Sequence, residues 1–162
     1  RESVSTLEDR GITLAIEPLN RFEGFLINTA EEGTAFCDLV GNKQLGIMLD
    51  VFHMSMEEDN IFSAILKSGK YLKHLHLAEN NRKLPGTGSF DWRKFFISLK
   101  NIGYCYRLDT ESFITAEGSV SASVALWRDL SNNADEEGYR KLMSQSLGFI
   151  SHLEKEYLSL SE

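Results

Sequence analysis

The chain has 162 residues, of which 42 % are hydrophobic and 25 % are charged, a composition typical of a globular protein rather than a disordered or fibrous one. Acidic residues outnumber basic residues by 24 to 17, and the net charge of −7 disfavours nucleic acid as the main partner, since phosphate binding requires a basic surface. No segment approaches the roughly 20 apolar residues of a membrane helix, so no membrane partner is expected. No secretory signal is visible at the start, and Cys37 and Cys105 form no disulfide framework, which favours a reducing, cytoplasmic location.

Short apolar runs alternate with segments of helical periodicity along the chain. A helix is predicted to begin at Thr29, because Thr29 and Glu32 have the spacing of a capping box. A second helix is predicted with Glu57-Glu58-Asp59 as an acidic first turn, which the helix dipole favours. The predicted strands are 13–17, 45–50, 71–77 and 104–111, and the predicted helices are 29–40, 57–67, 91–103 and most of the chain from 119 onward, with a break near 131–133.

Four strands that alternate with helices predict parallel βαβ units. Each predicted strand carries a polar residue near its end, and successive ones are separated by 33, 26 and 35 residues, about one unit each. The carboxyl ends of successive parallel strands lie side by side, so these side chains are expected to converge on one rim. They are Glu17, Asp50, His76 and Glu111.

Two glutamates, one aspartate and one histidine form an oxygen-rich ligand set that suits Mn²⁺ or Mg²⁺, with Co²⁺ as an alternative. Any one strand-end carboxylate could simply end a strand in solvent, but four in consecutive units carry more weight. His74 shares a strand face with His76, and Asp109 shares one with Glu111. The later residue of each pair is the predicted ligand, because it lies nearer the carboxyl end of its strand.

The motifs around these residues resemble those of the ketose 3-epimerases, a group within the xylose isomerase-like sugar isomerases and epimerases. The resemblance extends from about Thr13 to the C-terminal helices, and its motifs occur in the order and spacing of that family. They are EPLNRFE at 17–23, DVFHM at 50–54, HLHLAEN at 74–80 with Arg82, PGTG at 85–88, DW at 91–92 and ESF at 111–113.

The resemblance implies a (βα)₈ barrel, a divalent metal (usually manganese) and epimerisation of free ketose sugars at C3. It also implies assembly into homodimers or homotetramers. The residue roles that it implies are metal binding by Glu17, Asp50, His76 and Glu111, acid–base catalysis by Glu17 and Glu111, and sugar binding by Glu23, His53 and Arg82.

Alternative interpretations remain open from the sequence alone. The same site on the same barrel could serve an aldose–ketose isomerase of the hydroxypyruvate type, or the chain could be a catalytically inactive fragment. Arg82 could also be a solvated charge in a polar loop. An apurinic endonuclease is disfavoured, because that chemistry uses several metals and many histidines, and this chain has four histidines.

A complete (βα)₈ barrel requires about 250 residues. The 162 residues supply four predicted strands, so residues 1–162 are expected to form a single α/β domain equivalent to strands 5–8, the C-terminal half of a barrel. Because half a barrel leaves two sheet edges unpaired, we expect either that the natural protein is longer or that two chains associate. The first of these is the preferred interpretation.

Overall fold

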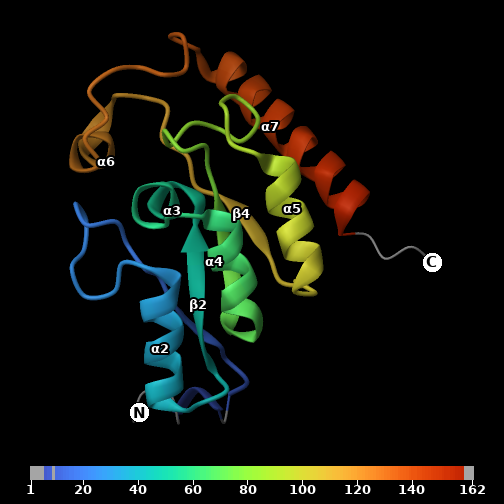
Figure 1. Cartoon of the computed structure of the whole chain (residues 1–162). Coiled ribbons are helices and arrows are strands. Elements are labelled where there is room, and N and C mark those ends of the chain that lie inside the picture. Colours follow the sequence, from blue (N-terminus) through green and yellow to red (C-terminus); the bar gives the residue numbers. More distant parts are fainter. Residues whose placement is uncertain (1–5, 9, 159–162) are drawn as a thin grey trace.

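The computed structural model describes residues 6–8 and 10–158, and it contains one parallel sheet of four strands. The strands are hydrogen-bonded in chain order, as in a barrel wall, and all three neighbouring pairs are parallel. This arrangement confirms the predicted α/β class (Figure 1). The strands are β1 (Leu14–Ile16), β2 (Leu45–Asp50), β3 (Leu72–Leu77) and β4 (Leu108–Thr110).

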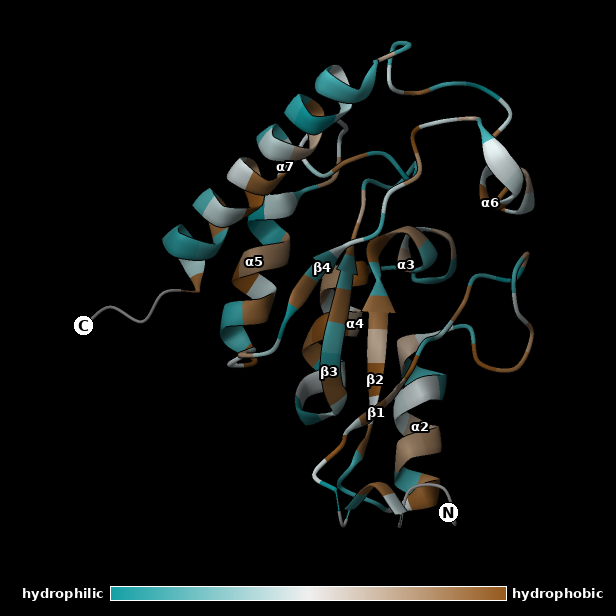
Figure 2. Ribbon diagram, turned by 180° about the vertical axis from the view of Figure 1, so that it is seen from behind, coloured by the Kyte–Doolittle hydropathy of each residue, from teal (hydrophilic) through white to brown (hydrophobic). Residues whose placement is uncertain are grey.

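Helices α2, α4 and α5 cover one face of this sheet, and α7 packs against α5 (Figures 1 and 2). In Figure 2, β2 and β3 lie in front of α4, and no helix of the described chain covers that opposite face of the sheet. The helices are α2 (Ala30–Val40), α3 (Val51–Glu57), α4 (Ile61–Ser68), the 3₁₀ turn η1 (Gly69–Tyr71), α5 (Trp92–Asn101), α6 (Gly118–Ser123) and α7 (Glu136–Tyr157).

The core lies between the sheet and these helices. Every residue of strand β2 is buried; on the face that no helix covers, the Lys73 side chain lies over Gly46 and Arg82 contacts Asp50. Leu75 of β3 and the neighbouring Phe95 and Phe96 of α5 are fully excluded from solvent. None of the helices in the described part of the chain combines the length and the apolar character that a membrane span requires.

The predicted start of α2 is confirmed. The Thr29 side chain accepts a hydrogen bond from the backbone N–H of Glu32, and the Glu32 carboxylate accepts one from the backbone N–H of Thr29. The helix ends at Gly41, whose positive φ of 68° suits glycine.

The predicted helix over 57–67 is wrong at its beginning, because this segment contains the end of one helix and the start of another. Glu57 is the last residue of α3, and Asn60 caps α4 by accepting the backbone N–H of Ser63 at 3.0 Å. Glu57 therefore does not belong to an acidic first turn. Its carboxylate accepts hydrogen bonds from Arg21. The additional helix α3 begins directly after Asp50, which places its first turn at the end of β2.

The largest further differences from the predicted boundaries are in the fourth strand and the C-terminal helical region, while the remaining boundaries shift by at most two residues. The fourth strand is limited to Leu108–Thr110. In the segment before it, the Tyr104 hydroxyl donates a hydrogen bond to the Arg107 carbonyl, so this segment is bent and not extended. The break in the C-terminal helical region extends over 124–135. Asn132 and Asn133 both have positive φ angles there, a conformation that an α-helix cannot continue through.

Candidate active site

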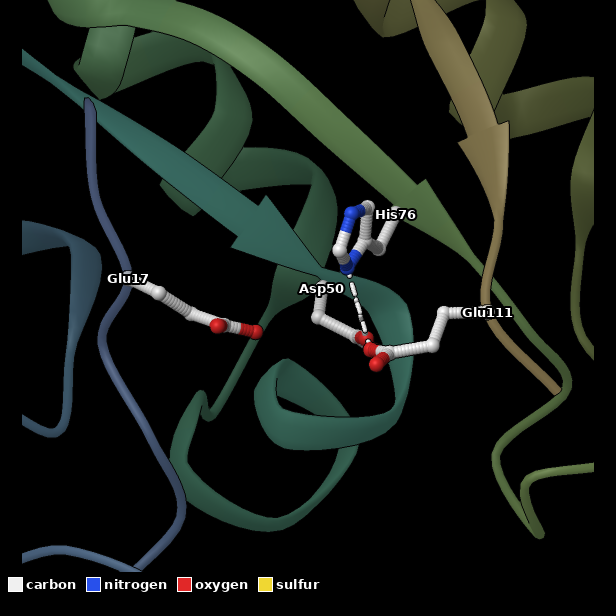
Figure 3. A group of neighbouring side chains, drawn as sticks. All are labelled: Glu17, Asp50, His76 and Glu111. Atoms are coloured by element: carbon white, nitrogen blue, oxygen red, sulfur yellow. Dashed lines mark hydrogen bonds and ion pairs between the residues drawn. The ribbon is translucent and has the colours of Figure 1, made fainter. Parts of the chain in front are cut away.

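Four strand-end side chains converge at the carboxyl edge of the sheet (Figure 3). Asp50 and His76 are register partners in β2 and β3, while Glu17 and Glu111 each follow directly after β1 and β4. One ligand atom from each residue lies within 4.8 Å of all the others. The structure therefore brings together the residues that the strand-end spacing selected.

The structure separates the two histidines of β3. His76 Nδ1 lies 3.0 Å from Glu111 Oε2 and 3.8 Å from Asp50 Oδ2. His74 Nε2 instead lies 3.3 Å from Asp109 Oδ2, further from the carboxyl edge. His74 and Asp109 thus form a pair of their own outside the four-residue group.

Arg82 lies inside the site and is not a solvated surface charge. Its guanidinium donates from Nη1 to Asp50 Oδ2 at 2.8 Å and from Nη2 to Glu111 Oε2 at 2.9 Å. Its side chain is only 11 % exposed, and the guanidinium lies over the rings of Phe52 and Phe113. This cation favours the ionised form of both carboxyl groups that it contacts.

The loop that carries Arg82 is anchored by Glu79, a fully buried carboxylate after β3. The Glu79 backbone exchanges hydrogen bonds with the loop, accepting from Arg82 N and donating to Lys83 O, both at 2.9 Å. Arg82 itself has a positive φ of 66°. Three donors point to the Glu79 carboxylate, namely the backbone N–H groups of Gly86 and Phe90 and the Trp92 indole N–H.

Glu79→Ala is expected to lower the free energy of unfolding by about 3 kcal/mol, because three donors lose their acceptor at a cost of about 1 kcal/mol or more each. Urea denaturation would measure this change. Replacement of the exposed Glu154 by alanine is the matched control and should leave the transition midpoint nearly unchanged. A Glu79→Ala midpoint equal to that of the control would contradict the anchoring role.

The remaining predicted site residues lie beside this group. His53 is in the first turn of α3, and its Nε2 lies 3.5 Å from Glu17 Oε1. Glu23 lies in the loop after β1 and accepts a hydrogen bond from Asn20 Nδ2 at 2.8 Å. Glu23 and Arg82 both line a cleft of about 210 Å³, together with Phe52, Asn81, Phe113 and 124–126.

Asn20 is a site residue to which the sequence assigned no role. It belongs to the EPLNRFE motif, yet a polar residue in a loop after a strand is ordinarily solvated. In the structure it is 1 % exposed and contacts both His53 and Glu23. The only sequence signal was its position between two predicted site residues, Glu17 and Glu23.

The environments of the carboxylates differ in their effect on ionisation. Burial and the nearby charge of Glu111 raise the pKa of Glu17. Burial raises the pKa of Asp50 to about 8, against the opposing effect of Arg82. Burial also acts against ionisation of Glu111, but Arg82, Asp50 and His76 together hold its pKa below the ordinary value. The two glutamates are therefore shifted in opposite directions.

Residues 1–142 match the family described as xylose isomerase-like TIM barrel. The chain belongs to this family. D-psicose 3-epimerase of Ruminiclostridium cellulolyticum is 42 % identical over 149 residues, covering 92 % of this chain and 51 % of that protein. L-ribulose 3-epimerase of Methylomonas sp. is 34 % identical, covering 88 % of this chain and 49 % of that protein.

Solved structures give the same result for this xylose isomerase-like chain. The crystal structure of D-psicose 3-epimerase with D-tagatose from Clostridium cellulolyticum H10 has a TM-score of 0.90 at 40 % identity. It is matched over 98 % of this chain and 54 % of that chain. The chain thus spans about half the length of the relatives that it matches, which agrees with the prediction of half a barrel.

Proposed function

We propose that this chain carries the acid–base and metal-binding half of a ketose 3-epimerase that acts on free ketose sugars. The observation that carries the proposal is the convergence of Glu17, Asp50, His76 and Glu111 within 4.8 Å at the carboxyl edge of the sheet. The names of the similar proteins, which are 3-epimerases of D-psicose and L-ribulose, support the substrate class.

The converging side chains fit a divalent cation by their chemistry. They offer carboxylate oxygens and one imidazole nitrogen and no thiolate, which favours manganese, with magnesium or cobalt as alternatives. When bound, such a cation would polarise the ketose carbonyl and so increase the acidity of the neighbouring C3–H bond.

Glu17 and Glu111 are the proposed acid and base. They extend toward the centre of the site from opposite ends of the sheet, with Asp50 and His76 between them (Figure 3). One glutamate removes the C3 proton, and the electron pair of that bond moves toward the carbonyl to give an enediolate. The other glutamate, in its protonated form, returns a proton to the opposite face of C3.

Glu23, His53 and Arg82 are the proposed sugar-binding residues. Glu23 and Arg82 border the cleft, and His53 lies against Glu17. Arg82 offers guanidinium donors to substrate oxygens where negative charge develops, while Glu23 can accept hydrogen bonds from sugar hydroxyls.

The test uses the full-length protein loaded with Mn²⁺ and a panel of ketoses in deuterated water. Incorporation of deuterium at C3 together with formation of the C3 epimer is the expected result. No exchange with any ketose would contradict the proposal. Proton transfer between C1 and C2 instead would identify the alternative aldose–ketose isomerase, and product analysis separates the two.

Assembly into a homodimer or homotetramer and the cytoplasmic location stay predictions.

Metal binding is expected to release a proton near neutral pH. Because the pKa of Asp50 is about 8 in the metal-free site, Asp50 holds a proton below that pH and must lose it to bind a cation. Apparent Mn²⁺ affinity should therefore rise about tenfold between pH 6.5 and pH 7.5, a slope of one proton. Calorimetric titration in buffers of different ionisation heat measures the release, and binding without proton release at pH 6.5 would contradict it.

A further inference from the structure

Asn20 is buried between two site residues, Glu23 and His53, although it lies in the loop that follows β1. Its side-chain Oδ1 accepts the backbone N–H of Phe22 at 2.9 Å. Because only an oxygen accepts such a bond, this contact fixes which end of the amide is the Nδ2 group. The Nδ2 group lies 2.8 Å from Glu23 Oε1 and 2.8 Å from His53 Nδ1, so its two hydrogens have two separate acceptors.

The backbone of Asn20 makes the protonation of the His53 ring unambiguous. The Asn20 backbone N–H donates to His53 Nδ1 at 3.3 Å, and a backbone N–H is only ever a donor. His53 Nδ1 therefore accepts hydrogen bonds and carries no proton, so the proton of the neutral ring is on Nε2. Nε2 is the ring atom that faces Glu17, at 3.5 Å from Oε1.

We propose that Asn20 is a positioning residue that holds His53 with its N–H on Nε2 facing the site and holds the Glu23 carboxylate beside it. In this state His53 donates a hydrogen bond toward the bound sugar or Glu17. The other tautomer would direct a lone pair at that place and could not stabilise an oxygen that gains negative charge. The expected effect on turnover rests on the proposed epimerase function, whereas the ring state of His53 does not.

The first test needs no substitution. The full-length protein is labelled with ¹⁵N-histidine, loaded with diamagnetic Mg²⁺ and observed by two-dimensional ¹⁵N–¹H spectroscopy. The His53 side-chain signals are assigned by through-bond correlation to the His53 backbone in a uniformly ¹³C,¹⁵N-labelled sample. We expect the pattern of an Nε2–H ring, and a proton on Nδ1 in the unsubstituted protein would overturn the proposal even if every variant failed to fold.

The second test changes the residue and uses a matched control. Asn20→Asp replaces the donating amide, 2.8 Å from His53 Nδ1, with a carboxylate that accepts. The backbone N–H remains at the longer distance of 3.3 Å, but a charge-assisted hydrogen bond to a carboxylate is about twice as strong as a neutral one, so we expect a proton to appear on His53 Nδ1. Asn60→Asp makes the same substitution at an exposed position away from His53, where the side-chain oxygen accepts the Ser63 N–H, a role that aspartate retains. The His53 pattern should be unchanged in that control. An unchanged pattern in Asn20→Asp would overturn the proposal.

Measurement of kcat and KM then separates the positioning of His53 by Asn20 from a general structural role of Asn20 in its loop. In the Mn²⁺-loaded protein, Asn20→Asp should lower kcat about 10- to 100-fold, the usual effect of losing a group that orients a functional side chain, with a smaller change in KM. An unchanged kcat together with a shifted ring state would overturn the positioning role. Absence of epimerisation in the unsubstituted protein would instead contradict the proposed function, leaving the spectroscopic result on His53 standing.

Discussion

Glu111→Gln is expected to lower epimerase turnover by about 10³- to 10⁴-fold, the upper range for loss of a general acid or base. Glutamine has the shape of glutamate and retains one acceptor oxygen for Arg82, which donates to Glu111 Oε2 at 2.9 Å. The fold should therefore persist, since Glu111 lies after β4 and is outside the core. The measurement is kcat for C3 epimerisation by the full-length protein at saturating Mn²⁺.

Solvent exchange makes this prediction specific to a pair of acid–base groups. Glu17→Gln leaves Glu111 able to remove and return a proton on one face of C3, so exchange without epimerisation is expected for one of the two C3 epimers. Glu111→Gln should show the same behaviour with the opposite epimer. Mass spectrometry of each recovered sugar after incubation in deuterated water measures the exchange.

The control is Glu117→Gln, which alters an exposed glutamate in the segment that follows Glu111. It should retain the turnover of the unsubstituted protein. A rate near native in either Glu17→Gln or Glu111→Gln would refute the acid–base assignment. Loss of exchange with both epimers in both variants would assign the two glutamates to metal binding alone.

Asp50→Asn is expected to weaken Mn²⁺ binding by more than about 100-fold, since loss of an outer partner of a metal ligand already costs up to that factor. Asparagine retains an oxygen that can accept the Phe52 N–H, as Asp50 Oδ1 does at 2.7 Å, so α3 should still be capped. The variant therefore separates the charge of Asp50 from its role in capping. Calorimetric titration with Mn²⁺ measures the affinity.

Asp50→Ala should differ from Asp50→Asn by destabilising the fold itself. It removes the side-chain cap of α3, which Asp50→Asn retains. Loss of a helix N-cap costs about 1 kcal/mol. Urea denaturation measures this loss of stability. Asp59→Asn, at an exposed position, is the control for the denaturation and for the Mn²⁺ titration. Tight Mn²⁺ binding by both Asp50 variants would contradict the proposal that Asp50 is a metal ligand.

The ends of the strands were predictable because buried parallel strands are continuous apolar runs that end at a polar residue, at one common edge of the sheet. The apolar run that ends at Asp50 reproduces β2 to the residue, and the capping box at Thr29 reproduces the start of α2. Helix boundaries between 51 and 68 were not predictable in the same way. Two short helices with caps at Asp50 and Asn60 have nearly the same apolar periodicity as one helix with an irregular start.

The sequence alone determined the family, the α/β class and the four residues that meet at the carboxyl edge, because their spacing of about one strand–helix unit leaves parallel strands little freedom in where they end. Only the tertiary structure decided that Arg82 bridges Asp50 and Glu111 and that Asn20 is buried against His53. Both residues lie in loops, whose paths depend on contacts between segments about 30 residues apart. A polar loop residue has the same local pattern whether it faces water or a buried partner, so its surroundings follow from packing and not from its neighbours in the chain.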